Sequence, residues 1–364
     1  MKVLHLITRM NTGGPAVFLD HLTHAIHPSC ESVIGYGHCE DNETDYTLEH
    51  ELSATMLKVN HLHRSLNPID DLRAFIEIRK IIKTEKPKVV NTHTSKAGVL
   101  GRIAAKSVSR KIKVVHTFHG HLIYGYFAKY KSLIFTLIEK FLSIFTDAAV
   151  AVTMETKDSL QNLGIGRKMK WKVIHIGVPN NDLISAPINL QPPLKLMWVG
   201  RFTGIKDPEY AVDVMKFLSG QDVELTMVGG GELYEQIKST SENLPIKFTG
   251  WMKDPFIKIK DFDLLLITSK NEGLPLVMLE AANNRRPTLA RNVGGMSEFI
   301  ENNKTGFLVD GGPEKMAAII KNLIGKKQEL IKLGNQANEV LHEEFSLKKM
   351  ASEYLDFYKS LSVR

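Results

Sequence analysis

The sequence predicts an α/β protein made of two doubly wound domains, each a parallel sheet with helices on both faces. Near-continuous runs of Val, Ile and Leu alternate with helical stretches along the whole chain, which is typical of parallel strands buried on both faces. A length of 364 residues exceeds one typical core and favours two domains of roughly 150–200 residues each. An apolar content of 43% and a charged content of 24% are ordinary for a globular protein.

The expected strands fall into two sets on either side of a linker. The first set spans residues 3–8, 33–36, 56–59, 89–92, 113–118, 148–153 and 172–176. The second set spans residues 194–199, 223–228, 246–249, 262–268, 287–290 and 306–309. The stretch 177–193 between them is rich in Pro and Asn and is the best candidate for a linker. We therefore place the domain boundary after residue 178.

The most informative motif pairs two carboxylates, Glu272 and Glu280, after the expected strand 262–268. Pro275 suits the first turn of a helix, because its missing N–H would have no partner there. The free N–H groups around Gly273–Val277 would form an anion site with Glu272 at its mouth. Glu280 would lie about 12 Å further along a helix that rises ~1.5 Å per residue. This layout fits one ligand with a central diphosphate, a sugar and a ribose, although an acidic helix start with an ordinary mid-helix Glu explains the pair in isolation.

Two cations follow an earlier strand. Arg201 and Lys206 lie in one loop after the expected strand 194–199, before a helix that begins at Pro208. They are well placed to neutralise a diphosphate, and Arg can grip two oxygens in a fork. A turn at Gly229–Gly231 would let a ligand approach the backbone. Singly, these features also fit surface charges and an ordinary loop. Because ligands of open α/β sheets bind at the carboxyl ends of the strands, we expect the site in the cleft between the domains.

In this order, the elements resemble the donor domain of retaining glycosyltransferases of the GT-B fold, in the large family that carries a Glu, seven residues and a second Glu. The resemblance covers nearly the whole chain. The further segments that carry it are 13–15, 92–102, 115–121, 249–251, 294–298 and 305–309. It implies two Rossmann-like domains with an interdomain cleft: an acceptor-binding domain of residues 1–178, onto which a C-terminal helix (346–364) packs back, and a nucleotide-sugar-binding domain of residues 179–345.

The resemblance also implies roles for particular residues. Glu272 would hold hydroxyls of the donor sugar, and Glu280 would hold the ribose diol of the nucleotide. Arg201 and Lys206 would hold the diphosphate. The other residues of the expected nucleotide-sugar site are Gly13, Gly14, Gly230, Trp251, Gly273, Leu274, Leu276 and Val277.

One histidine is implicated in the same way. His119, in the segment Thr-Phe-His, matches the family's active-site histidine on the acceptor-binding domain. His116 and His121 compete for that assignment. His21, His24 and His27 are spaced by three, but such positions drift by ~60° around a helix and Pro28 follows at once, so we expect a surface helix without a metal.

The reaction that the resemblance implies is sugar transfer from a nucleotide-sugar to a glycan or a lipid-linked diphosphate in cell-surface polysaccharide synthesis. UDP is the expected nucleotide from its prevalence in the family. Attack on the same face would retain the anomeric configuration, and Arg201, Lys206 and helix N–H groups would stabilise the departing diphosphate without a metal or other cofactor. A sugar-nucleotide epimerase of the same fold and a non-catalytic sugar-nucleotide-binding protein remain open. A nicotinamide-dependent oxidoreductase does not, because the full Gly-x-Gly-x-x-Gly pattern is missing.

Charge and composition bound the partners. Residues 1–178 hold 24 Lys and Arg against 16 Asp and Glu, whereas residues 179–364 hold 23 against 24. The basic first half indicates an anionic partner, and no nucleic-acid-binding signature accompanies it. An anionic membrane surface or a lipid-linked diphosphate fits better.

Cellular location is bounded by three further features. The two cysteines, Cys30 and Cys39, support neither a disulfide scaffold nor a Cys-based zinc site. The first residues predict a buried strand rather than a signal peptide, and no stretch approaches the ~20 apolar residues of a membrane span. We therefore expect a cytoplasmic protein that acts at the inner face of the membrane.

A final expectation concerns one helix and the stretch before it. An apolar stripe at helical spacing is expected to face the core; it consists of Ile134, Leu137, Ile138, Phe141 and Phe145. The preceding aromatic and basic stretch, 120–131, fits either a membrane or acceptor surface or internal packing.

Overall fold

The structure of the protein is a computed structural model that describes residues 1–40, 43–120, 129–180 and 188–362, with backbone alone at 129–131. The chain divides into two compact units, Met1–Pro179 with Ser346–Arg364 and Asn180–Phe345. The break after Pro179 lies in the Pro- and Asn-rich stretch. Which unit binds the acceptor and which the donor stays a prediction.

The first unit is built on a parallel sheet. Its described strands are β1 (Lys2–Ile7), β2 (Glu31–Tyr36), β3 (Thr55–Lys58), β4 (Val89–His93), β5 (Lys113–Phe118), β6 (Ala148–Ala151) and β7 (Lys170–Val173). They lie in the order β3-β2-β1-β4-β5-β6-β7, so the direction in which strands are added reverses between β1 and β4. Consecutive apolar side chains, which point to opposite faces, are buried on the central strands, as are Val3 and Leu4 on β1 and Val89 and Val90 on β4. This is the pattern of a sheet covered on both faces.

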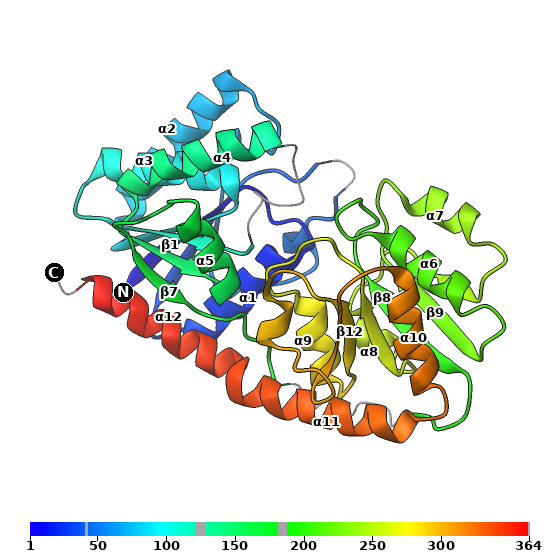
Figure 1. The fold of residues 1–364 in the computed structure, drawn as a ribbon. Helices are drawn as coiled ribbons and strands as arrows, with labels where there is room; N and C mark the ends of the chain where they lie inside the picture. The colour runs from blue at the N-terminus through cyan, green and yellow to red at the C-terminus, as the bar shows by residue number, and fades with distance from the viewer. Residues whose placement is uncertain (41–42, 121–128, 181–187, 363–364) are drawn as a thin grey trace. The chain divides into compact units, whose positions relative to one another are not determined.

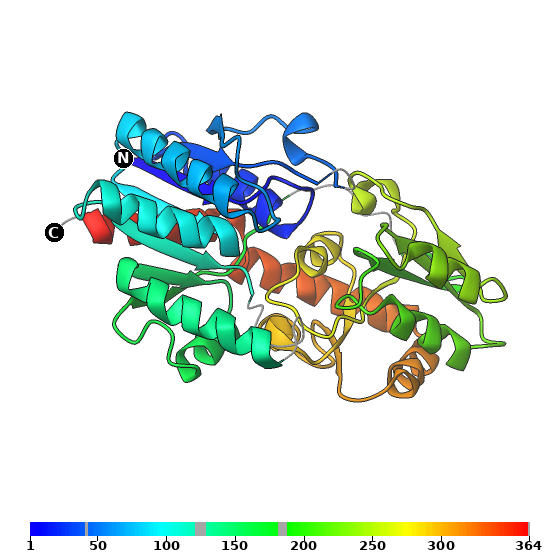
Figure 2. The same ribbon diagram turned by 90° about the horizontal axis from the view of Figure 1, so that it is seen from above.

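Helices of the first unit cover both faces of this sheet. They are α1 (Gly14–Ile26), α2 (Pro68–Glu85), α3 (Ser95–Val108), α4 (Lys129–Leu142), α5 (Met154–Asn162) and α12 (Leu347–Ser362), with 3-10 helices η1 (Tyr46–Leu48) and η2 (Ser143–Phe145). Figure 1 shows α2, α3 and α4 on one face and α1 and α12 on the other, and Figure 2 views the first three from above. The last helix of the chain thus packs on the first unit, where the Asn91 amide donates to the Tyr358 hydroxyl at 2.8 Å.

The second unit also has a parallel sheet with a central reversal. Its described strands are β8 (Leu194–Val199), β9 (Val223–Val228), β10 (Ile246–Phe248), β11 (Leu264–Ile267), β12 (Thr288–Arg291) and β13 (Gly306–Val309). Their order is β10-β9-β8-β11-β12-β13, with the reversal between β8 and β11. Its helices are α6 (Pro208–Phe217), α7 (Tyr234–Thr240), α8 (Pro255–Lys258), α9 (Leu276–Asn283), α10 (Pro313–Leu323), α11 (Lys327–Glu344) and the 3-10 helix η3 (Gly294–Glu298).

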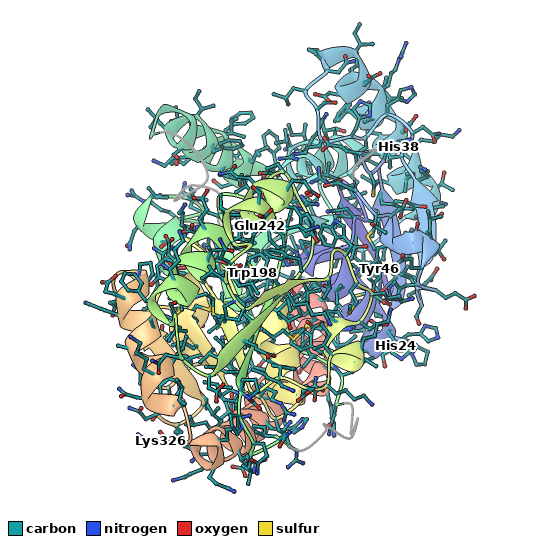
Figure 3. The ribbon with its side chains drawn as sticks, turned by 90° about the vertical axis from the view of Figure 1, so that its right-hand side faces the viewer. His24, His38, Tyr46, Trp198, Glu242 and Lys326 are labelled. Atoms are coloured by element: carbon teal, nitrogen blue, oxygen red, sulfur yellow. The ribbon has the colours of Figure 1, made fainter. Side chains whose placement is uncertain are left out.

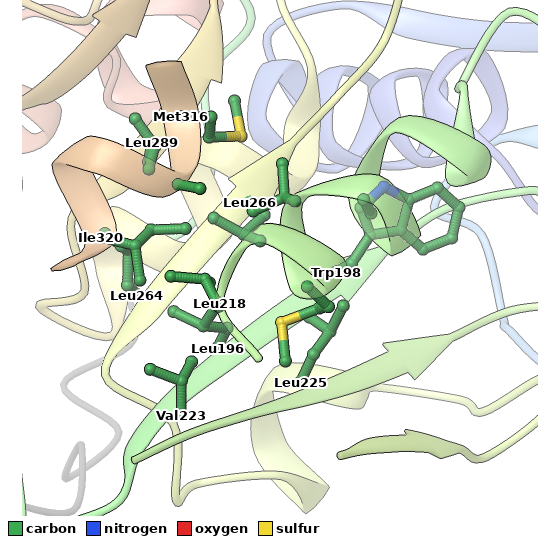
Figure 4. Packing of buried hydrophobic residues seen from close by; sticks show 14 of the residues in the cluster. Leu196, Trp198, Leu218, Val223, Leu225, Leu264, Leu266, Leu289, Met316 and Ile320 are labelled. Carbon is green, nitrogen blue, oxygen red and sulfur yellow. The ribbon is translucent and has the colours of Figure 1, made fainter. Parts of the chain in front are cut away.

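A continuous apolar core holds the second unit together. Side chains two residues apart on a strand point to the same face, as Leu196 and Trp198 do on β8 and Leu264 and Leu266 do on β11. Figure 4 shows these side chains packed together with Ile320 of α10. The core therefore positions the loops that leave the carboxyl ends of β8 and β11.

The predicted fold class is confirmed. Every expected strand is present among the described residues, and each pairing between named strands is parallel. The ends differ by a few residues, most visibly at β7, which begins at Lys170 rather than at residue 172. Strand ends depend on pairing with a neighbour, which a local apolar pattern does not report.

The predicted orientation of α4 is wrong. Four residues of the stripe expected to face the core are exposed, namely Ile134, Leu137, Ile138 and Phe141. Polar contacts attach the helix instead, because the Arg102 guanidinium on α3 donates two hydrogen bonds of 2.9 Å to the Glu139 carboxylate. The side chains of 121–131 lie outside the described residues, so both alternatives for that stretch stay predictions.

Candidate functional site

The candidate site of the second unit lies at the reversal in its strand order. β8 and β11 are direct neighbours there, with Leu264 opposite Leu196 and Leu266 opposite Trp198. The loop after β8 carries Arg201 and Lys206, and the loop after β11 carries Glu272. Loops that leave adjacent strands in opposite directions open a crevice for ligands in folds of this kind.

Lys206 and Glu272 meet directly across these two loops. The Lys206 ammonium forms an ion pair with Oε1 of Glu272, and both side chains are largely buried. The Ser269 hydroxyl donates to the same oxygen at 2.6 Å. Both donors converge on Oε1, which leaves Oε2 as the oxygen for further partners. Ser269 was not among the predicted site residues, because nothing in its sequence spacing distinguishes it from an ordinary loop serine.

A buried threonine ties the two loops together beneath this pair. The Thr268 hydroxyl lies 2.9 Å from the carbonyl oxygens of Lys206 and Asp207 and accepts from the Trp198 indole at 2.9 Å. The Asp207 carboxylate accepts from Arg291 at 3.0 Å. These contacts hold the backbone of the Lys206 loop, so the ammonium is presented from a fixed base.

The start of α9 supplies unpaired backbone donors next to Glu272. The helix begins at Leu276, no side chain caps it, and Pro275 is the N-cap residue rather than part of the first turn as predicted. The first N–H groups of a helix have no intrahelical partner and carry partial positive charge. The expected anion-binding amides of Gly273, Leu274, Leu276 and Val277 all lie in this segment.

A glycine loop after β12 closes over the same segment. Gly294 adopts a φ of +53°, and a Cβ there would stand 1.8 Å from the Glu272 carbonyl oxygen. The Gly295 N–H donates to the Gly273 carbonyl at 3.1 Å. Close packing of backbone on backbone thus requires glycine at position 294 and fixes the turn that carries Glu272.

Glu280 occupies a different environment from Glu272 on the same segment. Burial raises the pKa of the Glu280 carboxyl to about 7, and the nearby Asp254 adds to the rise. A carboxylate held near its midpoint at neutral pH is a candidate ligand-binding group, because donors from a ligand would restore its charge.

The other second-unit candidates fall into two groups. Gly230 and Trp251 are brought together, since a Cβ at Gly230 would stand 2.5 Å from the indole nitrogen of the half-exposed Trp251. Arg201 lies two residues beyond the end of β8 and is partly buried. The loop that carries Arg201 contacts the turn at Gly229–Gly231, because the Phe202 N–H donates a hydrogen bond of 2.9 Å to the Gly230 carbonyl.

The first-unit candidates follow β1 and β5. Gly13 is the N-cap of α1 and Gly14 its first residue, and the carbonyl of Gly13 accepts from the N–H groups of Ala16 and Val17 at 3.1 and 3.2 Å. The nearest atom to a Cβ at Gly13 would be 3.8 Å away, so local packing does not demand glycine there.

The three competing histidines differ in position, and which of them acts in the active site stays a prediction. His119 is the candidate at the edge of the sheet. It directly follows β5, at the carboxyl edge of the sheet. His116 is buried on the opposite face, where its Nδ1 lies 2.8 Å from the Thr92 hydroxyl and its ring packs on Gly98 of α3. His121 lies outside the described residues. The structure adds His93, whose Nδ1 is 2.9 Å from Nε2 of His119, to which the sequence analysis gave no role.

The three histidines at 21, 24 and 27 do not converge. His24 is exposed, bonds the Ser53 hydroxyl at 2.9 Å and is labelled in Figure 3. Within the described residues, no group of three His, Cys, Asp or Glu side chains is arranged to hold a metal ion. In the same residues, no helix combines the length and the apolar character that crossing a bilayer requires.

Comparison with known proteins places this chain in a family. The crystal structure of Anabaena HepE in complex with UDP-glucose matches with a TM-score of 0.82 at 20% identity, over 99% of this chain and 100% of that one, which shows the fold. The family Glycosyltransferase Family 4 matches residues 12–181, and Glycosyl transferases group 1 matches residues 193–326. An Escherichia coli protein named UDP-Gal:alpha-D-GlcNAc-diphosphoundecaprenol alpha-1,3-galactosyltransferase is 30% identical over 269 residues, 68% of this chain and 69% of that protein. The chain belongs to the GT-B glycosyltransferases.

A second relative is also named as a glycosyltransferase. This glycosyltransferase is 28% identical to the E. coli O-antigen biosynthesis glycosyltransferase WbnH over 307 residues, 84% of this chain and 85% of that protein. The predicted family and the prediction of an enzyme are therefore confirmed. Retention of configuration and the roles of Glu272 and Glu280 stay predictions.

Proposed function

We propose that this glycosyltransferase moves a sugar from a UDP-sugar to a glycan or lipid-linked diphosphate acceptor in cell-surface polysaccharide synthesis, with retention, at the cytoplasmic face of a membrane. The name of the E. coli relative, with UDP-galactose as donor and a diphosphoundecaprenol acceptor, supports this donor and acceptor class. The ion pair between Lys206 and Glu272 beside the start of α9 is the observation that carries the proposal.

When a nucleotide-sugar binds, Lys206 and Glu272 would separate and contact different parts of it. A diphosphate carries more negative charge than one carboxylate, so the Lys206 ammonium would turn to the diphosphate. The amides at the start of α9 and Arg201 would add further donors there. Glu272, still held through Ser269, would then be free to accept from hydroxyls of the sugar.

The same groups suit the proposed chemistry. The acceptor oxygen would attack the anomeric carbon on the face from which UDP departs, while the bond from that carbon to the β-phosphate oxygen breaks. The acceptor's proton would pass to that phosphate oxygen, giving a glycosylated acceptor and UDP. Negative charge grows on the β-phosphate in this step, so cations and helix amides aimed at it lower the barrier without a metal.

The membrane component of the proposal rests on α4. This helix is anchored by the Arg102–Glu139 fork and by the buried Thr136 and Leu142, and turns its apolar face outward. Exposed fractions on that face run from 37% to 75% for Leu133, Ile134, Leu137, Ile138, Phe141 and the adjoining Ile144. A contiguous apolar patch rimmed by charge marks an interaction surface.

Charge favours an anionic bilayer as the occupant of this face. Residues 1–95 hold 10 Lys and Arg against 12 Asp and Glu, whereas residues 96–178, which include α4, hold 14 against 4. The positive charge of the first unit is therefore concentrated in the segment that presents the apolar stripe. Apolar side chains with flanking cations are the composition of interfacial helices.

The proposal is tested with the full-length protein and a panel of UDP-sugars. A short-chain polyprenyl-diphosphate-linked GlcNAc serves as acceptor, with a chelator present, and both UDP release and the anomeric configuration of the product by NMR are measured. Lys206→Ala should lower turnover by ~10²–10³, the scale of losing one charge-stabilising donor. Lys216→Ala, an exposed lysine paired with Asp213 on α6, is the matched control and should be unaffected. An inverted product, dependence on a divalent cation or near-normal turnover of Lys206→Ala would contradict the mechanism.

A further inference from the structure

Three histidines form a diagonal across neighbouring strands of the first sheet. His5 lies on β1 opposite Asn91 of β4, and His93 lies two residues beyond Asn91. His93 in turn lies opposite Thr117 of β5, and His119 lies two residues beyond Thr117. Because side chains two residues apart share a face, all three rings lie on one face and step toward the carboxyl edge.

The rings are linked nitrogen to nitrogen. Nδ1 of His5 is 3.2 Å from Nε2 of His93, and Nδ1 of His93 is 2.9 Å from Nε2 of His119. Phe18 of α1 packs edge-on against His119 with ring centroids 4.7 Å apart, and Tyr358 of α12 packs near His5. The two end nitrogens, Nε2 of His5 and Nδ1 of His119, are buried and have no hydrogen-bond partner in the described part of the chain.

The protons of this array can be counted. Burial lowers the pKa of His5 to about 3 and that of His119 to about 4, and burial with the neighbouring histidines lowers the pKa of His93 well below its usual value. Each ring is therefore neutral near pH 7 and carries one N–H. Each of the two contacts between ring nitrogens needs one N–H donor and one lone-pair acceptor. Only two arrangements of the three protons satisfy both contacts: every ring carries its proton on Nδ1, or every ring carries it on Nε2.

The two arrangements differ in whether Nε2 of His5, at the inner end of the array, carries a proton. Protons on Nε2 would leave an N–H of His5 without an acceptor deep in the sheet. Protons on Nδ1 leave only a lone pair there and place the spare N–H on His119 at the carboxyl edge. Either arrangement leaves one N–H without a partner in the described part of the chain. The Nδ1 arrangement moves that N–H from His5, which is fully buried, to His119, which is partly exposed at the carboxyl edge, where water or a ligand can accept it. Buried N–H groups without acceptors are rare in proteins, so the Nδ1 arrangement is favoured.

We propose that His93, backed by His5, is a positioning residue that holds His119 in its Nδ1–H form, so that His119 acts toward its ligand as a neutral hydrogen-bond donor and not as a base. Which ring nitrogen carries the proton is set by the bond that the other nitrogen makes. The ligand that receives this N–H, an oxygen of the donor sugar or the acceptor, rests on the proposed function.

NMR on ligand-free protein with ¹⁵N-labelled histidine reports directly which ring nitrogen of each histidine carries the proton. The His119 signals are identified as those that are missing from the spectrum of His119→Gln. We expect a protonated Nδ1 and an unprotonated Nε2 in the wild type. His93→Leu should abolish that pattern, whereas His93→Asn, whose amide can replace Nδ1 of His93 as donor, should restore it. His24→Gln, an exposed histidine outside the array, is the control.

Kinetics give the second readout. His93→Leu should lower kcat about tenfold, the effect of one hydrogen bond on a barrier, with KM for the UDP-sugar little changed and His93→Asn recovering most of the loss. An Nε2–H signal for His119 in the wild type, or a His119 signal that His93→Leu leaves unchanged, would overturn the proposal. The expected spectra in a protein inactive with every UDP-sugar would support the array and contradict the proposed function, so the two failures are distinguishable.

Discussion

Glu272 and Glu280, eight residues apart, meet opposite electrostatic conditions. Glu272 accepts from the Lys206 ammonium and from the Ser269 hydroxyl. Glu280 is partly buried, and this burial, together with the nearby charge of Asp254, raises the pKa of its carboxyl to about 7. We infer that a ligand supplies hydrogen-bond donors to the Glu280 carboxylate.

The raised pKa of Glu280 predicts a pH-dependent nucleotide affinity. Ribose hydroxyls donating to the carboxylate would favour its charged form, so binding should release a proton below pH 7. Affinity for UDP should then fall by up to about tenfold per pH unit as the pH drops below the free-protein pKa. Calorimetry from pH 5.5 to 8.5 checks this, with Glu280→Gln as the control, because the UDP phosphate itself titrates near pH 6. Parallel pH profiles for the two proteins would count against Glu280 as the ribose ligand.

The same pKa shift has a consequence for folding stability. The folded state holds the Glu280 proton more tightly than the unfolded state, whose carboxyl has the ordinary value of 4.5. Stability contributed by the protonated form is therefore present below pH 4.5 and is lost as the pH rises toward 7. This is a local cost of function that bound nucleotide would offset.

Substituting Glu272 and Glu280 should affect the binding of different parts of the nucleotide-sugar. Glu280→Gln should weaken free UDP by ~1.5–3 kcal/mol, the worth of a charge-assisted hydrogen bond. Glu272→Gln should leave free UDP nearly unchanged and act when the sugar is present. Equilibrium binding of UDP and of the UDP-sugar to both variants checks this. Equal losses of free UDP affinity would show that the proposed division of roles is wrong.

At the scale of elements, one buried lysine joins α11 to the start of the second unit. The Lys327 ammonium pairs with the Asp263 carboxylate at 2.8 Å, and the two side chains are only 5% and 2% exposed. It also donates to the carbonyls of Asn189, Gln191 and Pro193 at 2.7, 2.8 and 2.9 Å. The ammonium thus fastens irregular backbone ahead of β8 to α11 and to β11.

Removing this ammonium should destabilise the protein severely. Lys327→Met would leave the buried Asp263 carboxylate without its counter-charge and would remove a donor from three carbonyls, a change expected to cost ~3–5 kcal/mol. The adjacent Lys326, labelled in Figure 3, is exposed, and Lys326→Met should change stability by less than about 0.5 kcal/mol. Urea unfolding of both variants measures the difference. Similar midpoints would show that the pair contributes little.

At the scale of the whole molecule, surface charge and exposed apolar area coincide on the first unit. The segment 96–178 holds 14 Lys and Arg against 4 Asp and Glu, and it includes the outward face of α4. On α2 a second set, Ile69, Leu72 and Ile76, is exposed as well. Two exposed apolar stripes on one unit are more than scattered surface residues, so the first unit is the expected membrane-facing part.

Binding to anionic vesicles should depend on α4. Changing both Leu137 and Phe141 to Asp should reduce co-sedimentation with phosphatidylglycerol vesicles, since each loses burial and meets negative lipid. Phe217→Asp, an exposed phenylalanine on α6 of the second unit, is the control. High salt should weaken the wild-type interaction, because each Lys or Arg near such a surface contributes ~1 kcal/mol that is screened over roughly 8 Å. If wild type never co-sediments, or if it and the α4 variant bind equally, a soluble acceptor or a protein partner becomes the better reading of this face.

The sequence by itself determined the fold class, the number of strands and their succession along the chain, and the loops that carry Arg201, Lys206 and Glu272. These features are local: apolar runs mark buried strands, and Pro and Gly mark the turns after them. The orientation of α4 could not be read this way, because an apolar stripe has the same period whether it faces a core or a membrane. Only the tertiary structure, through the Arg102–Glu139 fork, decided which face turned inward.

The histidine array and the Ser269 contact were decided by tertiary structure for a related reason. His5, His93 and His119 are far apart in sequence and meet only because β1, β4 and β5 are neighbours in a register that steps by two residues. Ser269 acquires a role only because its strand ends beside the loop that carries Lys206. Pairing of distant strands sets which side chains share a face, and composition and spacing along the chain do not contain that information.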